Sequence, residues 1–71
     1  MNVGAAIREL MNERGMRSID LCRASGISAG YLSMVLNSKI SDPSLLRVKM
    51  MANALGVTVD EIVELADKYE E

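Results

Sequence analysis

The run from Ser18 to Lys39 restricts the fold of this chain more than any other part of its sequence. Its apolar spacing predicts two short amphipathic helices, over about 18–25 and 29–37. The turn Gly26-Ile27-Ser28 joins them. Gly26 falls where the first helix has to end, and glycine enters the left-handed backbone region there without strain. Because Ser28 is placed to cap the second helix, the run predicts two helices crossed on a very short turn.

The apolar residues of this run are spaced so that the two helices can pack on each other. Leu21 and Cys22 can meet Leu32 and Val35, while Ile27 fills the corner between the helices. Two helices crossed on a short turn form the helix-turn-helix motif, which presents its second helix to the major groove of DNA. Few other functions need this arrangement, so the run indicates a DNA-binding domain.

The length and composition predict one small domain over residues 1–71. This length is near the lower limit for a chain that folds without disulfides or bound metal ions. Hydrophobic residues make up 49% of the chain, which excludes a disordered polypeptide. No apolar run approaches the ~18 residues of a membrane span, and the N-terminus lacks a signal-peptide pattern. We therefore expect a soluble, cytoplasmic protein that contacts no membrane.

The chemistry available to the chain is narrow, because it has no histidine and a single cysteine, Cys22. This composition excludes a Cys/His metal site and an internal disulfide, and we expect Cys22 to be a small buried hydrophobe in a reducing compartment. The sequence offers no nucleophile–base pair and is too short to enclose a pocket. We expect no enzyme, no cofactor and no small-molecule ligand.

A helix is predicted before the motif, from about Val3 to Arg14, with Asn2 as its N-cap and Gly15 as its stop. Its inward face follows helical spacing and consists of Ala6, Ile7, Leu10 and Met11.

Two more helices are predicted after the loop 38–43, whose Pro43 cannot continue a helix. Ser44 caps the first of them, Gly56 ends it, and its inward residues are expected to be Leu45, Val48, Met51, Ala52 and Leu55. Thr58 and Glu61 form a capping box for the last helix, from Val59 to about Tyr69. With no strand pattern, the fold class is all-α with five helices.

Four blocks of residues, and the spacing between them, match the sequence pattern of a known family. They are Ile7-Arg8-Glu9-Leu10 with Arg14-Gly15-Met16, Gly26-Ile27-Ser28 with Tyr31-Leu32-Ser33 and Asn37-Ser38-Lys39, Pro43-Ser44-Leu45, and Ala52 with Ala54-Leu55-Gly56-Val57. Over about residues 3–65 the chain resembles the phage repressor/Cro family, also called the XRE family. The resemblance implies a five-helix, lambda-repressor-like domain that regulates transcription by binding operator DNA as a homodimer.

Two departures from the family's pattern bear on this resemblance. Members usually open the second helix with Ser-Gln, whose Gln side chain grips a phosphate, whereas this chain has Arg17-Ser18. Ser18 can still donate a hydrogen bond, and Arg17 can supply a phosphate contact by charge. Many members also pair a basic residue with a Glu at the positions of Met11 and Leu36, and here both are apolar. Because both partners are replaced, no charge is left buried without its partner.

The outward positions of the third helix are the candidates for contacting DNA. The resemblance implies that Ala29, Gly30, Ser33 and Met34 touch base edges. None of these carries the Arg, Gln or Asn side chain that makes bidentate bonds to bases. We therefore expect modest direct discrimination, with phosphate contacts and DNA shape adding to it.

Further contacts are expected around this helix, and each has a structural alternative. Ser28 is first a helix cap, and Tyr31 either bonds a phosphate or covers the seam between the first and third helices. Asn37, Ser38 and Lys39 begin a loop that in the family runs along the DNA backbone, or they form only a turn. Arg47 and Lys49 can reach phosphates or only solubilise their helix.

The charge is divided unevenly along the chain. The formal net charge is −2, but residues 1–57 carry +3 and residues 58–71 carry −5. The positive charge of residues 1–57 favours DNA binding, because the direction of the protein's electric field matters more for binding than its net charge. The alternative is a protein-interaction module of the same fold, such as an antirepressor or antitoxin. The absence of strong base-contacting side chains on the third helix favours this alternative.

A homodimer is expected because one short helix, whose side chains contact bases weakly, cannot recognise a DNA site alone. Val59, Ile62, Val63 and Ala66 form the stripe of the last helix that packs on the body. Leu65 and Tyr69 lie on a neighbouring edge, and together with Val57 they are predicted to form the two-fold contact. The alternative is that Tyr69 folds back onto its own domain.

Overall fold

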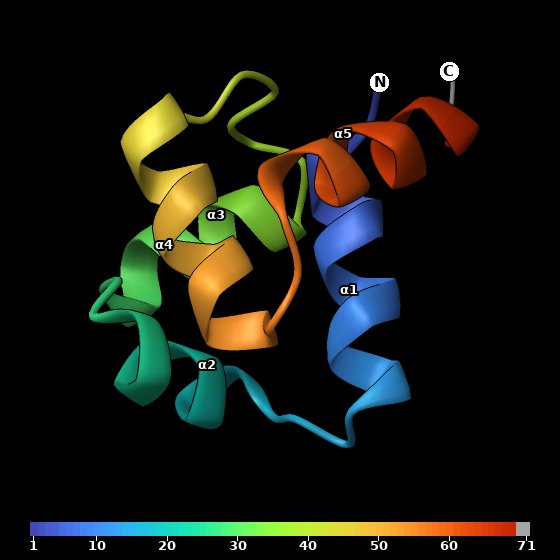
Figure 1. The fold of residues 1–71 in the computed structure, drawn as a ribbon. Coiled ribbons are helices and arrows are strands. Elements are labelled where there is room, and N and C mark those ends of the chain that lie inside the picture. Colours follow the sequence, from blue (N-terminus) through green and yellow to red (C-terminus); the bar gives the residue numbers. More distant parts are fainter. Residues whose placement is uncertain (70–71) are drawn as a thin grey trace.

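The computed structural model describes residues 1–69, and in this part of the chain all regular structure is helical. The helices are α1 (Val3–Glu13), α2 (Ser18–Ser25), α3 (Ala29–Leu36), α4 (Leu45–Leu55) and α5 (Val59–Lys68). α1 and α5 lie side by side, and α2, α3 and α4 form the rest of the body (Figure 1). The backbone N–H of Asn2 donates to the carbonyl of Ala66 at 3.0 Å, which fixes the start of α1 to α5. The all-α, five-helix prediction is confirmed.

Side-chain caps begin four of the five helices, as predicted from Asn2, Ser28, Ser44 and Thr58. Each side-chain oxygen accepts a hydrogen bond from the backbone N–H three residues later, at distances between 3.0 and 3.3 Å. Such a bond satisfies one of the donors that a helix leaves unpaired at its start. Glu61 completes the capping box by accepting from the backbone N–H of Thr58 at 3.4 Å.

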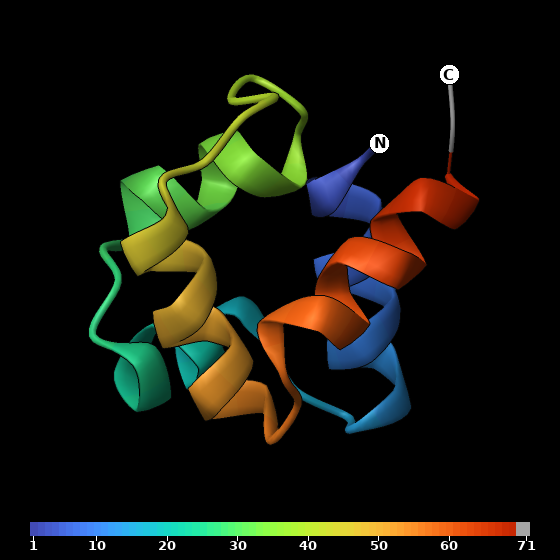
Figure 2. The same ribbon diagram turned by 45° about the horizontal axis from the view of Figure 1, so that its top comes forward.

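The helix ends fall within one residue of the prediction. α1, α3 and α5 each end one residue earlier than expected, because Arg14, Asn37 and Tyr69 are C-caps with non-helical backbone angles. Gly26 ends α2 with a φ of 80°, in the left-handed region where only glycine is unstrained. With the top of the molecule turned forward, Figure 2 shows the short turn that joins α2 to α3.

All five helices contribute to one hydrophobic core. Its largest fully buried side chains are Ile7, Leu21, Val35, Leu32, Met51 and Ile62. The predicted inward stripe of α1 is confirmed, and Ile27 is buried at the corner of the motif as expected. Cys22 is half-buried and packs against this core. Met11 and Leu36, the apolar pair of α1 and α3, are both buried.

Leu45 corrects the predicted inward face of α4. The other four residues of that face are buried, but the Leu45 side chain is 73% exposed. Leu45 is the first residue of α4, and Pro43 in the preceding loop is buried instead. The first turn of α4 therefore begins at the surface, although helical spacing predicts an inward position for Leu45.

The stripe of α5 is buried only in part. Ile62 and Ala66 are fully buried, whereas Val59 and Val63 are half-buried. Val59 and Val63 line an apolar groove together with Pro43, Leu45 and residues near the N-terminus. Part of the accessible apolar surface of the domain therefore lies in this groove, between the start of α4 and α5.

Gly4 allows α1 and α3 to approach closely, a role that the periodicity of α1 does not reveal. A Cβ atom added at Gly4 would lie 2.3 Å from the carbonyl oxygen of Val35. That oxygen is backbone and cannot swing aside as a flexible side chain could. The contact sets the distance between the first helix and the third.

Candidate nucleic-acid interface

α3 buries one face and exposes the other, which is the arrangement that a recognition helix requires. Leu32, Val35 and Leu36 are buried, as predicted. The expected DNA-facing residues are all exposed: Ser28, Ala29, Gly30, Ser33, Met34 and Asn37. Met34, with 46% of its surface exposed, is the largest apolar side chain of α3 that reaches solvent. The exposed face is therefore built from small groups around one thioether.

Gly30 stands in the first turn of α3 without any packing reason to be glycine. A Cβ atom built there meets no heavy atom within 4 Å, and its φ is not in the left-handed region. Glycine lowers helix stability relative to alanine. The absent side chain therefore leaves the backbone of α3 open to close approach from outside.

Polar side chains at the end of α3 are held by one another. The amide of Asn37 donates to the carbonyl of Ser33 at 2.9 Å and to its hydroxyl at 3.3 Å. The amide oxygen of Asn37 in turn accepts from the Arg8 guanidinium at 3.4 Å. Since these partners belong to the protein itself, Asn37 and Ser33 have less hydrogen-bonding capacity left for bases.

The turn after α3 holds Lys39 at the surface in a fixed backbone. Ser38 has a φ of 59°, a left-handed conformation unusual for a residue with a side chain. The N–H of Lys39 donates to the carbonyl of Met34 at 2.8 Å, and the N–H of Ser38 donates to that of Val35 at 3.1 Å. These bonds form the Schellman ending of a helix, in which this position is usually glycine.

Arg17 and Ser18 lie exposed at the start of α2, where a phosphate contact was expected. The Arg17 guanidinium donates to both carboxylate oxygens of Asp20, at 3.2 and 3.3 Å. These hydrogen bonds raise the pKa of Arg17 and lower the pKa of the Asp20 carboxyl. A phosphate would therefore compete with Asp20 for this guanidinium.

Two other arginines among residues 1–57 close the ends of helices. Arg8 donates through Nε to the carbonyl of Leu36 at 3.1 Å, and Arg14 donates through Nε to the carbonyl of Leu55 at 2.6 Å. A cation at a helix C-terminus pairs with orphan carbonyls and with the negative end of the helix dipole. The sequence indicated their charge and their place in the family's blocks but not these bonds, because their partners are 28 and 41 positions away.

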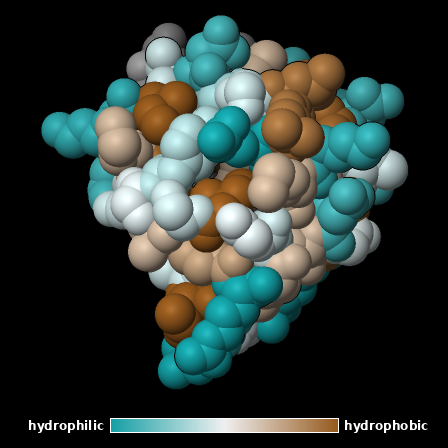
Figure 3. Space-filling view, turned by 90° about the vertical axis from the view of Figure 1, so that its left-hand side faces the viewer, coloured by the Kyte–Doolittle hydropathy of each residue, from teal (hydrophilic) through white to brown (hydrophobic). Residues whose placement is uncertain are grey.

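Tyr31 and Arg47 form a contact between α3 and α4 that spacing did not predict. The guanidinium carbon of Arg47 lies 5.0 Å from the centre of the Tyr31 ring, within the range of a cation–π interaction. The two line a cleft of about 380 Å³ with the α2–α3 turn. Figure 3 shows this side of the molecule, where hydrophobic residues (brown) and hydrophilic residues (teal) are interspersed on the surface.

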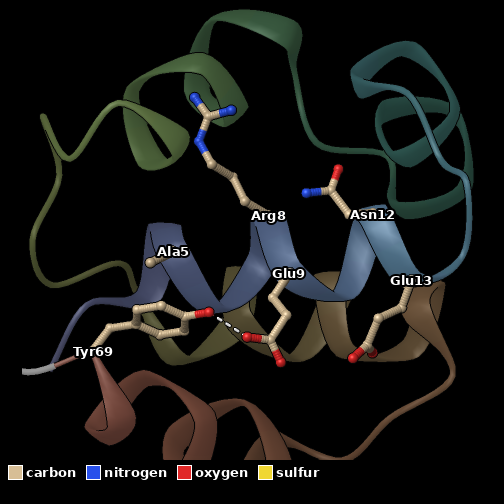
Figure 4. A pocket seen from close by; sticks show the side chains of 6 residues that line it. All are labelled: Ala5, Arg8, Glu9, Asn12, Glu13 and Tyr69. Atoms are coloured by element: carbon tan, nitrogen blue, oxygen red, sulfur yellow. Dashed lines mark hydrogen bonds between the residues drawn. The ribbon is translucent and has the colours of Figure 1, made fainter.

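Tyr69 folds back onto its own domain, as the alternative for this residue supposed. Its hydroxyl donates to a carboxylate oxygen of Glu9 on α1 (Figure 4), and the ammonium of Lys68 lies 3.6 Å from the same oxygen. The hydrogen bond to Glu9 raises the pKa of the Tyr69 phenol. Val57 and Leu65, the other residues of the predicted dimer contact, are half-buried against the core. The predicted edge is therefore less open than the sequence suggested.

Within residues 1–69, no helix is both long and apolar enough to cross a lipid bilayer.

The match to a family follows from these helices and their spacing. A family model described as helix-turn-helix, of the XRE type, matches residues 7–62. The chain belongs to this family, which confirms the resemblance drawn from its sequence blocks. Among characterised proteins it is similar to the HTH-type transcriptional regulator DdrOP3 of Deinococcus deserti, with 35% identity over 69 residues. The alignment covers 97% of this chain and 53% of that regulator, so the chain spans about half the length of this relative.

Proposed function

We propose that this chain binds double-stranded DNA and regulates transcription, acting as a homodimer whose two α3 helices enter the major groove. The observation that carries the proposal is the exposed face of α3, which α2 precedes and the fixed turn at Lys39 follows in the chain. Membership of the helix-turn-helix family supports it, as does the similarity to a protein named a transcriptional regulator. In this motif the second helix reads base edges while flanking groups hold phosphates.

The residues proposed to contact DNA are those on and beside α3. Ala29, Gly30, Ser33 and Met34 face the bases, with the Met34 thioether and the Ala29 methyl available to thymine methyl groups. Arg17, Ser18, Ser28, Tyr31, Asn37 and Lys39 contact the backbone. Since Ser33 and Asn37 already bond each other, sequence selectivity should depend on shape and on apolar contacts more than on bidentate bonds.

Selection of bound sites from random duplexes with the purified protein tests this proposal. The expected result is a two-fold symmetric consensus whose half-sites are about one helical turn apart. Lys39→Ala should weaken binding to all sequences about equally and reduce the slope of log affinity against log salt by about one. Binding that is sequence-selective but independent of salt would contradict the phosphate contacts.

A protein-interaction module of the same fold is the competing function, and the small side chains on the exposed face of α3 favour it. A module of this kind would give no enriched sequence in the selection and no salt-dependent shift of a duplex. The same experiment therefore separates the two functions.

The dimer contact is proposed at the edge formed by Val57, Leu65 and Tyr69, which their own domain buries only in part, although the Tyr69 hydroxyl bonds Glu9. Leu65→Glu should then shift the monomer–dimer equilibrium toward monomer in sedimentation and weaken binding to a two-fold site. Leu45→Glu is the matched variant, because Leu45 is the most exposed large apolar residue of the described chain. If only Leu45→Glu dissociates the dimer, the contact lies at the apolar groove beside α4 and the proposed edge is wrong.

A further inference from the structure

The cations of the described chain divide into those bonded to protein acceptors and those that are not. Arg8, Arg14 and Arg17 each donate to a carbonyl or a carboxylate of the chain, and Lys68 forms a salt bridge with Glu9. Among residues 1–69, the remaining basic side chains are Arg23, Lys39, Arg47 and Lys49, and no hydrogen bond or salt bridge engages them. Arg47 differs from the other three because an aromatic ring holds its guanidinium in place.

The stacked position of Arg47 leaves its hydrogen-bond donors free. A cation over an aromatic face is attracted by the ring's electrons and not by a hydrogen-bond acceptor. The guanidinium therefore keeps five N–H donors in a planar fork that matches the oxygens of a phosphate. Being already oriented, it loses little side-chain freedom when it binds.

The place of Arg47 in α4 is unfavourable for a residue with only a structural role. Its backbone N–H donates to the Ser44 cap, so Arg47 stands in the first turn of α4. A cation there faces the positive end of the helix dipole, where acidic residues are preferred. α5 follows that preference with Asp60 and Glu61 in its first turn. The same end of α4 that disfavours a cation adds to the attraction of an anion.

The surroundings of Arg47 supply further donors. The cleft that it lines with Tyr31 also includes Ser28, the cap of the proposed recognition helix. The Ser28 hydroxyl oxygen accepts from the N–H of Tyr31, which leaves its own proton to donate. Within residues 1–69 the Tyr31 hydroxyl makes no hydrogen bond. Three residues with groups able to donate to an anion, Ser28, Tyr31 and Arg47, therefore line one cleft beside the start of α3.

We propose that Arg47, positioned by the Tyr31 ring, binds one phosphodiester group of the DNA backbone beside α3. The proposal rests on the proposed function, since the ligand is the backbone of the duplex that α3 enters. It adds a contact from α4 to those from α2, α3 and the turn after α3. Tyr31 acts as the positioning residue, and the guanidinium supplies the charge-assisted hydrogen bonds.

Arg47→Gln tests the contact without weakening the helix. Glutamine three residues after Ser44 completes a capping box, so the variant should unfold at or above the temperature of the parent protein. On a selected duplex, its affinity should fall about tenfold at about 0.1 M salt, and the salt slope should decrease by about one. Lys49→Gln is the matched control, because it removes the same charge from the same helix on nearly the opposite side. Its affinity should fall less than about threefold.

A set of duplexes in which single phosphates are replaced by neutral methylphosphonates identifies the partner. One replacement should weaken the parent protein about as much as Arg47→Gln does, and should have little further effect on that variant. Tyr31→Phe, which keeps the ring, should retain this pattern, and Tyr31→Leu should lose it. The inference is overturned if Arg47→Gln binds as Lys49→Gln does, or if no replacement distinguishes Arg47→Gln from the parent. If the parent protein binds no duplex at all, the proposed function itself has failed.

Discussion

Gly30→Ala should make the protein more stable and a poorer DNA binder. Alanine favours a helix over glycine by up to about 1 kcal/mol, and part of this gain comes from the restricted unfolded chain. Gly30 is the second residue of α3, and a Cβ atom there meets no heavy atom within 4 Å. No steric cost offsets the gain, so we expect the free energy of unfolding to rise by about 0.5–1 kcal/mol.

Thermal unfolding followed by circular dichroism measures the first half of this prediction. In a domain of this size a gain of about 1 kcal/mol raises the melting temperature by roughly 4–8 °C, and half that gain raises it by roughly half as much. The second half is a loss of affinity for a selected duplex, since the added methyl group would stand between the backbone of α3 and the groove. A loss of about 1 kcal/mol of binding free energy would weaken affinity about fivefold.

The stability and the DNA affinity of Gly30→Ala test separate parts of this prediction. A lower melting temperature for Gly30→Ala would refute the claim that no packing or backbone demand fixes this glycine. A higher melting temperature with unchanged DNA affinity would refute the claim that DNA approaches α3 closely at this position. Because the expected changes have opposite signs, loss of folded protein cannot be mistaken for loss of a contact.

Four substitutions test the packing of α1 on α3 and the turn that follows α3. Gly4→Ala should destabilise the fold by about 1–3 kcal/mol in chemical denaturation, because its Cβ would lie 2.3 Å from the carbonyl oxygen of Val35. Ser38→Gly should stabilise it by about 1 kcal/mol, because φ is 59° there, and an unchanged denaturation midpoint would contradict this. Leu36→Glu should lower the free energy of unfolding by about 3 kcal/mol, because it buries a carboxyl group, and adding Met11→Arg should recover part of that loss. Purely additive effects in the double-mutant cycle would mean that the two positions do not interact.

The helices were predictable because their boundaries depend on local chemistry. An N-cap such as Ser28 bonds an N–H three residues away, and the conformation of Gly26 depends on its missing Cβ atom. The burial of Leu32 and Val35 follows from helical spacing once the motif is recognised. These interactions lie within a few residues, so one sequence contains all the information that they require.

What was not predictable depends on residues distant in the sequence. Leu45 has the spacing of a buried residue, yet it is 73% exposed, because burial depends on which other parts of the chain cover a position. Arg8 and Arg14 count as basic surface until α3 and α4 bring their last carbonyls within reach. The stack of Arg47 on Tyr31 likewise requires two helices to be placed correctly. Sequence reasoning therefore located the candidate interface but did not show which of its cations are already bonded.

The separation of charge within the fold is compatible with DNA binding by a chain of net charge −2. α5 carries Asp60, Glu61, Glu64 and Asp67, and it packs mainly on α1 and α4, whereas α3 packs mainly on α1 and α2. The domain extends 29 × 22 × 21 Å, while at about 0.1 M salt exposed charges are screened over about 10 Å. A phosphate bound at α3 would therefore interact most strongly with the cations nearest to it, since α5 is not among the main packing partners of α3. Because the unbonded cations are few, the orientation of each one should matter more for binding than the net charge of the chain.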